Sequence, residues 1–173
     1  MKNIYLCGFM GCGKTTVADA LAKQRGLPCY DIDALIVKQQ GMTIPQMFER
    51  GEAFFRQAET AALRATGSVP GIYATGGGIL TQEENGQLLN QMGILVFLDT
   101  PFSLCYQRIR GDENRPNAVS RTREELLALY EQRLPHYQKW SVLSVSGEGA
   151  PQQIAKTILE KISVLDPSWS QNQ

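Results

Sequence analysis

GFMGCGKTT, residues Gly8 to Thr16, follows a short apolar run and precedes a segment of helical composition. It contains Gly-x4-Gly-Lys-Thr, a pattern that gains its meaning between a strand and a helix. The glycines let successive backbone N–H groups curl around phosphate oxygens at the positive end of a helix dipole. Lys14 would reach the β- and γ-phosphates of a nucleotide, and the Thr15 hydroxyl would bind Mg²⁺. Because a simple glycine-rich turn leaves both side chains unexplained, the stretch predicts a P-loop.

Outward from this loop, short apolar runs alternate with amphipathic segments along the whole chain. The apolar runs predict strands at 4–7, 28–31, 71–75, 94–98 and 142–145. The segments between them predict helices at 14–24, 34–40, 43–50, 52–66, 81–92, 101–110, after 122 and at 151–165. Five apolar strands alternating with helices are typical of a parallel sheet covered on both faces. We therefore expect an α/β protein with three α/β/α layers and a five-stranded parallel sheet.

Local signals mark where several of these helices begin. Capping boxes are expected at Thr43-Ile44-Pro45-Gln46, at Thr81-Gln82-Glu83-Glu84 and at Thr122-Arg123-Glu124-Glu125. Thr100-Pro101 is expected to supply the N-cap and the first helical position of the next helix.

Composition limits the class of protein. The 173 residues carry no formal net charge and are 43% hydrophobic, which suits one globular domain at 1–165 with a frayed tail at 166–173. A neutral chain offers no field that attracts nucleic acid or an anionic membrane, and no apolar run approaches the ~18 residues of a membrane helix. Four cysteines without C-x-x-C spacing favour the reducing cytoplasm. We expect a monomer.

Two further motifs follow predicted strands. Asp31-Ile32-Asp33 presents carboxylates at the carboxyl edge of the sheet, where open α/β sheets bind ligands. Helix N-capping is the alternative, and it would account for Asp33 alone. The stretch IYATGGGIL, residues 72 to 80, holds three consecutive glycines, which indicate either a linker or main chain that lies very close to a ligand. A strand before them and a helix after them exclude the linker.

Arginines supply candidate anion ligands. Arg133 extends an apolar helical stripe, where it would either snorkel to solvent or bind a carboxylate or phosphate. Arg56 is flanked by Glu52 and Glu59, which would hold its side chain, although a surface ion pair has the same pattern. The polar segment around Arg115 is either a solvated charge run or a lid over the transferred phosphate. The absence of N-K-x-D from the sequence counts against a GTPase.

Taken together, these motifs resemble the shikimate kinases, small P-loop enzymes of aromatic amino-acid biosynthesis built like nucleoside monophosphate kinases. The family's motifs occur in its order and at close to its spacing over about residues 1–162. They are GFMGCGKTT, DID, GEAFFRQAE, TGGG, NRP and RLPHY, the last beginning at Arg133. The resemblance implies Mg²⁺-dependent transfer of the ATP γ-phosphate to the 3-hydroxyl of shikimate, giving shikimate 3-phosphate and ADP.

The resemblance also implies roles for individual residues. Shikimate would be bound by Asp33 at its ring hydroxyls and by Arg56 and Arg133 at its carboxylate. The walls of its pocket would be Gly76, Gly77, Gly78, Phe48 and Phe55. Thr15 and Asp31 would be the magnesium residues. ATP would be held by Gly8, Gly11, Cys12, Gly13, Lys14, Thr15 and Thr16, with Arg108 against adenine. Arg115 would belong to a mobile lid at about 111–123, and the catalytic residues would be Lys14, Asp33 and Arg115.

The sequence departs from the family pattern in two places and leaves alternatives open. Family members often continue Arg-Pro with leucines, whereas here Arg115-Pro116 runs into Asn117-Ala118. Asp99, at the end of a predicted strand, competes with Asp31 as the metal carboxylate. Alternative functions are a kinase of another small hydroxy acid, such as gluconate, and a non-catalytic nucleotide-binding module.

Overall fold

The computed structural model describes residues 2–110 and 120–167. Its strands within these residues form a single five-stranded sheet in the order β2-β3-β1-β4-β5. Every neighbouring pair is parallel. The strands are β1 Asn3–Cys7, β2 Cys29–Asp31, β3 Ile72–Ala74, β4 Gly93–Asp99 and β5 Leu143–Ser146. The expected sheet is therefore confirmed.

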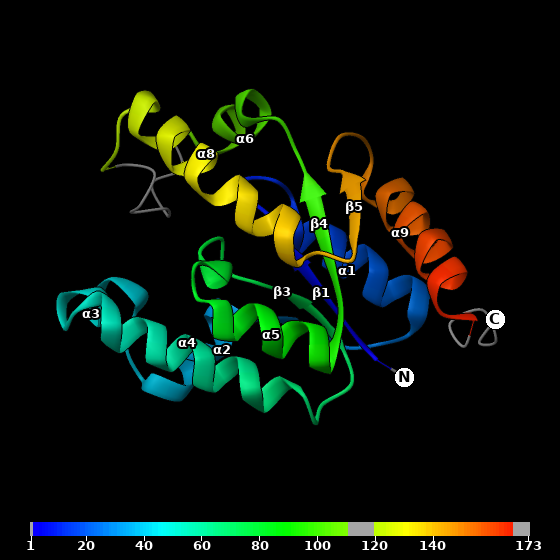
Figure 1. Cartoon of the computed structure of the whole chain (residues 1–173), viewed down its shortest axis with the longest axis horizontal. Coiled ribbons are helices and arrows are strands. Elements are labelled where there is room, and N and C mark those ends of the chain that lie inside the picture. The colour runs from blue at the N-terminus through cyan, green and yellow to red at the C-terminus, as the bar shows by residue number, and fades with distance from the viewer. Residues whose placement is uncertain (1, 111–119, 168–173) are drawn as a thin grey trace.

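Helices cover both faces of this sheet (Figure 1). The described helices are α1 Lys14–Arg25, α2 Ile32–Gln40, α3 Ile44–Glu49, α4 Glu52–Thr66, α5 Glu83–Met92, α6 Phe102–Ile109, α8 Arg123–Trp140 and α9 Pro151–Leu165, with a short 3₁₀ helix, η1, at Ile79–Thr81. Helices α1 and α9 pack against each other, α1 also against β3 and α9 against β5. Helices α5 and α8 both pack on β4. The three-layer α/β/α architecture is confirmed, and no described helix is long and apolar enough to cross a membrane.

The central strands lie deep in the core, as parallel strands covered on both faces must. All five residues of β1 are buried, and so are the first six of β4. Toward the other edge of the sheet, the Tyr73 ring of β3 stacks between Tyr5 and Tyr30, with ring centroids 5.1 Å apart on each side. These aromatic contacts tie β2 and β3 to β1, so the ends of the three strands are held at fixed positions.

Two of the expected helix starts are wrong. Helix α5 begins at Glu83 and its N-cap residue, Gln82, makes no side-chain cap, because Thr81 belongs to η1 and its hydroxyl donates to the Gly78 carbonyl at 2.7 Å. Helix α6 begins at Phe102, and the Thr100 hydroxyl is buried and donates to the Cys12 carbonyl at 3.2 Å. In both places a threonine satisfies a nearby loop carbonyl and does not cap its helix. The capping boxes at Thr43 and Thr122 are confirmed.

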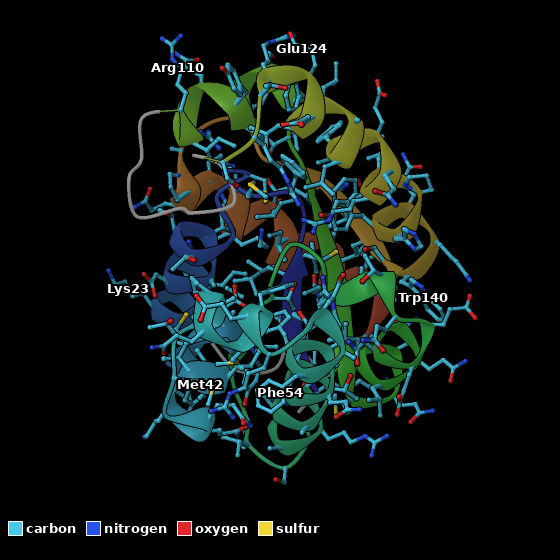
Figure 2. The ribbon with its side chains drawn as sticks, turned by 90° about the vertical axis from the view of Figure 1, so that its left-hand side faces the viewer. Lys23, Met42, Phe54, Arg110, Glu124 and Trp140 are labelled. Carbon is cyan, nitrogen blue, oxygen red and sulfur yellow. The ribbon has the colours of Figure 1, made fainter. Side chains whose placement is uncertain are left out.

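The topology brings three chain segments to one edge of the sheet. Strand β1 lies between β3 and β4, so β2 and β3 are added on one side of it and β4 and β5 on the other, and ligands bind at such a switch point in open α/β sheets. The P-loop follows β1, the two aspartates stand at the end of β2, and the triple glycine follows β3. Figure 2 shows the two ends of the molecule in this view: Phe54 of α4 lies near the bottom, and Glu124 of α8 lies at the top. Of the predicted lid at about 111–123, residues 111–119 lie outside the described residues.

Candidate active site

The P-loop has the backbone conformation that its glycines allow. Gly8, Gly11 and Gly13 all have positive φ, at 148°, 79° and 101°. A Cβ on Gly11 would also lie 2.7 Å from the Cys105 carbonyl oxygen, too close for any side chain. The Lys14 ammonium donates to the Gly8 carbonyl at 2.7 Å and to the Phe9 carbonyl at 3.1 Å, within the curve of the loop. The loop and the first turn of α1 therefore form a cationic cradle that suits phosphate.

Beside the cradle, a hydroxyl and a carboxylate lie close together. The Thr15 hydroxyl, on α1, is 3.4 Å from the Asp31 carboxylate. The Asp31 side chain also caps α2 by accepting from the Ala34 N–H at 3.2 Å. The capping role considered for Asp33 therefore belongs to Asp31. Asp99 is the last residue of β4, on the other side of β1 from β2, which carries Asp31.

Asp33 presents an unpaired carboxylate oxygen to the same region. Its Oδ1 atom is buried and has no hydrogen-bond partner among the described residues. Burial raises the pKa of Asp33 and the nearby Asp31 carboxylate raises it further, while Lys14 and Arg56 oppose the shift. A carboxylate with a raised pKa and a free oxygen is suited to accept a hydrogen bond, or a proton, from a bound hydroxyl group.

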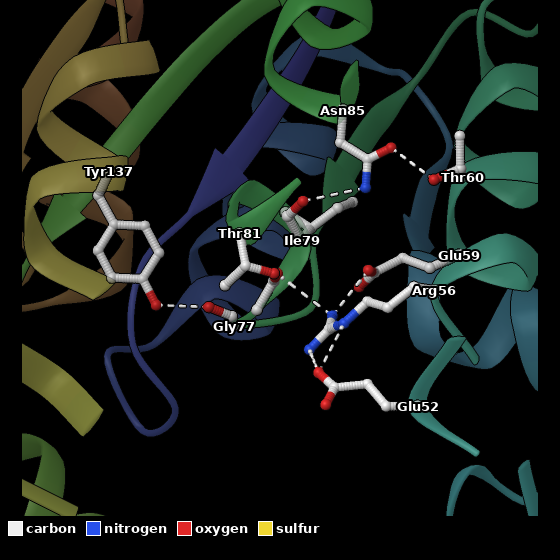
Figure 3. Close-up of polar contacts among 10 residues, drawn as sticks. Glu52, Arg56, Glu59, Thr60, Gly77, Ile79, Thr81, Asn85 and Tyr137 are labelled. Carbon is white, nitrogen blue, oxygen red and sulfur yellow. Dashed lines mark hydrogen bonds and ion pairs between the residues drawn. The ribbon is translucent and has the colours of Figure 1, made fainter. Parts of the chain in front are cut away.

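Arg56 is fixed by a network of acceptors on one side of the pocket (Figure 3). From α4 it donates to Glu59 at 2.8 Å and to Glu52 at 3.4 Å, and it reaches the Gly78 carbonyl at 3.2 Å. Glu59 is almost fully buried, and that burial raises its pKa while the Arg56 guanidinium opposes the rise. The surface ion-pair interpretation of Arg56 is therefore wrong, because only 12% of its side chain is exposed.

Arg133 approaches the same point from α8. A Cβ placed on Gly78 would lie 3.1 Å from an Arg133 guanidinium nitrogen and 2.8 Å from one of Arg56, so the two cations converge there. The Arg133 Nε atom is buried and without a partner among the described residues. Burial lowers the pKa of Arg133 and the Arg56 charge lowers it further. Two guanidiniums held this close form a site for an anion, and their planar forks match a carboxylate.

Two adjoining cavities contain these groups. The first has a volume of about 200 Å³, and we call it the acid pocket. It is lined by Met10, Asp33, Ile44, Phe48, Phe55, Arg56, Glu59, Gly76, Gly77, Gly78 and Arg133. The second, of about 540 Å³, lies over the P-loop: Met10, Gly11, Gly13, Lys14, Thr15, Thr16, Asp31, Asp33, Thr75, Gly77 and Arg108. Met10, Asp33 and Gly77 line both, so Asp33 stands where a small acid would meet a nucleotide.

Comparisons with known proteins agree with this geometry. A family model described as shikimate kinase matches residues 10–163. A shikimate kinase from Persephonella marina is 39% identical over 165 residues, which cover 94% of this chain and 99% of the relative. The solved structure of a shikimate kinase from Acinetobacter baumannii in complex with shikimate superposes with a TM-score of 0.87 at 38% identity, over 96% of this chain and 95% of the other.

The chain belongs to the shikimate kinase family. It is therefore an ATP-dependent phosphotransferase. A gluconokinase from Sinorhizobium meliloti also superposes, with a TM-score of 0.66 over 96% of this chain and 94% of the other. At 18% identity this likeness shows the fold alone.

Most residues expected from the shikimate kinase pattern line the two cavities, whereas Gly8 and Cys12 do not. Arg108 is exposed and donates to the Gly11 carbonyl at 3.1 Å, at the rim of the P-loop. Cys12 is buried, with its sulfur 3.7 Å from the Lys14 ammonium, and does not line the cavity over the loop. Arg115 lies outside the described residues.

Two apolar residues of the acid pocket were not expected from the sequence, and the expected contact of Glu59 with Arg56 is confirmed. Met10 and Ile44 line the acid pocket, and Glu59 fixes Arg56 from inside it. Met10 and Ile44 give no chemical signal in the sequence because they are ordinary apolar residues. The burial of Glu59 could not be predicted, because its spacing from Arg56 is the same for a buried partner as for an exposed one.

Proposed function

We propose that this chain is a shikimate kinase, which transfers the γ-phosphoryl group of ATP to the 3-hydroxyl of shikimate and releases shikimate 3-phosphate and ADP. The observation that supports this most strongly is the convergence of Arg56 and Arg133 on Gly78, across Asp33 from the P-loop. An acid bound there through its carboxylate directs its hydroxyl groups toward the nucleotide.

The acid pocket suits a small cyclic hydroxy acid. Two guanidiniums bind the carboxylate, and the carbon skeleton rests on an apolar wall. That wall includes the Phe48 and Phe55 rings, which stack with centroids 4.6 Å apart. The glycines allow close approach, since a Cβ on Gly76 would lie 2.8 Å from Asp33 Oδ1. The cavity of about 200 Å³ leaves room for a single small ring.

Asp33 orients the acceptor hydroxyl and accepts its proton as the oxygen attacks phosphorus. Its unpaired buried oxygen is available for that hydrogen bond. Transfer is in line: the bond from the acceptor oxygen to the γ-phosphorus forms as the bond from that phosphorus to the β–γ bridging oxygen breaks. Lys14 stabilises the charge that develops on the phosphates. Arg115 remains a prediction for the same task.

The described residues also fit a magnesium ion. No three of their His, Cys, Asp and Glu side chains cluster to form a protein-only metal site. Mg²⁺ bound with a nucleotide needs only one or two protein oxygens, because phosphates and water supply the others. The Thr15 hydroxyl and the Asp31 carboxylate, 3.4 Å apart at the rim of the cradle, are the oxygens we assign to it. The ion would neutralise charge on the β- and γ-phosphates.

Other properties follow from the charge and the cysteines. We propose a cytoplasmic monomer that binds neither nucleic acid nor membranes. The formal net charge of zero supports the absence of both partners. Within the described residues all four cysteines are free thiols, as expected in a reducing compartment.

A coupled assay of ADP release tests the proposed activity against its rivals. We expect rapid ADP formation with ATP, Mg²⁺ and shikimate, and turnover at least about 100-fold slower with gluconate, whose open chain does not match a closed ring pocket. Preferential turnover of gluconate would contradict the proposal. Nucleotide binding without turnover of any hydroxy acid would favour the non-catalytic module.

A further inference from the structure

The glycine loop, residues 75–78 between β3 and η1, is held by hydrogen bonds to the carbonyl oxygens of its three glycines (Figure 3). Four consecutive carbonyls, from Gly76 to Ile79, each accept a bond from the protein. The donors are the Ile79 N–H to Gly76 at 3.3 Å, the Tyr137 hydroxyl to Gly77 at 2.5 Å, Arg56 and Thr81 to Gly78, and the Asn85 amide to Ile79 at 3.0 Å. Side chains hold the last three of these carbonyls, and two of the donors, Tyr137 and Arg56, come from helices α8 and α4.

Tyr137 is the donor that approaches from α8, on the opposite side of the loop from α4 and Arg56 in Figure 3. Its side chain is 1% exposed, and its ring stacks on Phe97 of β4 with centroids 5.2 Å apart. Gly77 and Gly78 line the acid pocket, whereas Tyr137 does not. The hydroxyl therefore holds the loop without lining the pocket itself, and it also interacts with the Arg133 guanidinium.

Peptide geometry connects this bond to the pocket. In a trans peptide the carbonyl and the following N–H point in opposite directions, and no described peptide is cis. Fixing the Gly77 carbonyl on Tyr137 therefore fixes the Gly78 N–H on the other side of the chain. A guanidinium nitrogen of Arg56 and one of Arg133 lie 2.8 and 3.1 Å from the position that a Gly78 Cβ would take, so this peptide borders the place where they would bind an anion.

We propose that Tyr137 is a positioning residue for the acid substrate: its hydroxyl orients the Gly77–Gly78 peptide so that the Gly78 N–H donates to the carboxylate held by Arg56 and Arg133. The inference rests on the proposed function. It gives α8 two tasks one helical turn apart, because Arg133 binds the carboxylate directly and Tyr137 aims a backbone donor at it.

Kinetics of Tyr137→Phe in the full chain test the proposal, because this change keeps the ring that stacks on Phe97. We expect the KM for shikimate to rise about tenfold, with kcat and the KM for ATP within about twofold of wild type. Tyr73→Phe is the matched control. It removes an equivalent bond from a buried tyrosine hydroxyl to a carbonyl, that of Val69 at 2.7 Å, away from the pocket. It should leave the KM for shikimate unchanged.

The outcomes separate the inference from the proposed function. An unchanged KM for shikimate in Tyr137→Phe, or an equal rise in Tyr73→Phe, would overturn the inference while wild-type activity upholds the function. A wild-type protein that does not turn over shikimate would overturn both. Should Tyr137→Phe fail to fold, amide NMR of the wild-type protein decides. We expect the Gly78 N–H proton to shift downfield on addition of shikimate, and no shift would overturn the inference.

Discussion

Asp33, the proposed proton acceptor, carries a free-energy penalty in the folded protein. Its carboxyl is partly buried beside Asp31, and both effects raise its pKa above the ordinary value of 3.8. Because the pKa of Asp33 is higher in the folded than in the unfolded chain, its contribution to stability is fully present below the unfolded-state pKa. That contribution is lost as the pH rises through the folded-state pKa. At neutral pH the ionised Asp33 therefore lowers the free energy of unfolding.

The change Asp33→Asn separates activity from stability. We expect kcat to fall by about 10² to 10⁴, because the proton acceptor is lost. We also expect a higher Tm at pH 7, by about 2 to 4 °C for each kcal/mol recovered, and no gain in Tm below pH 3.8. Calorimetry across pH measures this difference. A lower Tm at pH 7, or a gain independent of pH, would be inconsistent with the buried carboxylate.

The same raised pKa has a kinetic consequence. Because Asp33 must be ionised to accept a proton, kcat/KM for shikimate should fall as the pH drops through its folded pKa. The acidic limb of the profile should lie above the value of 3.8 of an ordinary aspartate. A pH profile of wild-type kcat/KM checks this. An acidic limb at or below 3.8 would contradict the raised pKa of Asp33.

Arg56 and Arg133, which we call the carboxylate clamp, should differ in their effect on Tm when each is replaced. Arg133→Ala should raise the Kd for shikimate by roughly 30- to 150-fold, about 2 to 3 kcal/mol, with ATP binding preserved. Arg56→Ala should do the same and also lower Tm, since Glu59, 1% exposed, loses its ion-pair partner. Arg64→Ala, on the same helix but 60% exposed in an ion pair with Glu84, is the control and should change neither quantity. Calorimetric titration with shikimate and thermal melts measure these effects, and equal behaviour of all three variants would refute the clamp.

Among the elements, the glycine loop and the helix ends use glycine for different physical reasons. Gly78 has an ordinary φ of −105°, but a Cβ there would press on both guanidiniums. Gly26, at the C-cap of α1, has a φ of 62° and open space around it. The first glycine is required by the ligand site and the second by the backbone.

Alanine at these two positions should therefore give opposite results. Gly78→Ala should raise the KM for shikimate at least about tenfold with little change in Tm, because only flexible side-chain ends must move. Gly26→Ala should lower Tm by about 2 to 4 °C through roughly 1 kcal/mol of left-handed strain, and leave the kinetics unchanged. Steady-state assays and melts of both variants decide. Normal shikimate kinetics in Gly78→Ala would show that the guanidiniums do not meet at this glycine.

Elements with strong local signals were predictable to the residue, and those with long-range partners were not. Helices α4 and α9 begin and end where the amphipathic pattern and the flanking glycine or proline indicated. Thr100 satisfies a local N-cap pattern, yet its hydroxyl binds a carbonyl 88 positions away. Tyr137 likewise meets Gly77, 60 positions away. A carbonyl acceptor has no residue type, so no sequence pattern reveals such a pair.

Across the whole molecule, the site depends on the order of the strands. The P-loop, the aspartates and the glycine loop end three neighbouring strands, and helices α4 and α8 each contribute one arginine to the acid pocket. The sequence motifs predicted which ligand groups the site binds, because phosphate and carboxylate binding need particular residue types. The distances could not be predicted, because only packing sets how α4 and α8 meet at Gly78.

The central claim is that the carboxylate of the acceptor is held by Arg56 and Arg133 across Asp33 from the nucleotide. The most direct measurement compares kcat/KM for shikimate and for its methyl ester, in wild type and in Arg133→Ala. If the guanidiniums bind the carboxylate, wild type should prefer the acid by roughly 30- to 150-fold, and the preference should be clearly smaller in the variant, in which Arg56 alone remains. The same preference in both proteins would contradict the account.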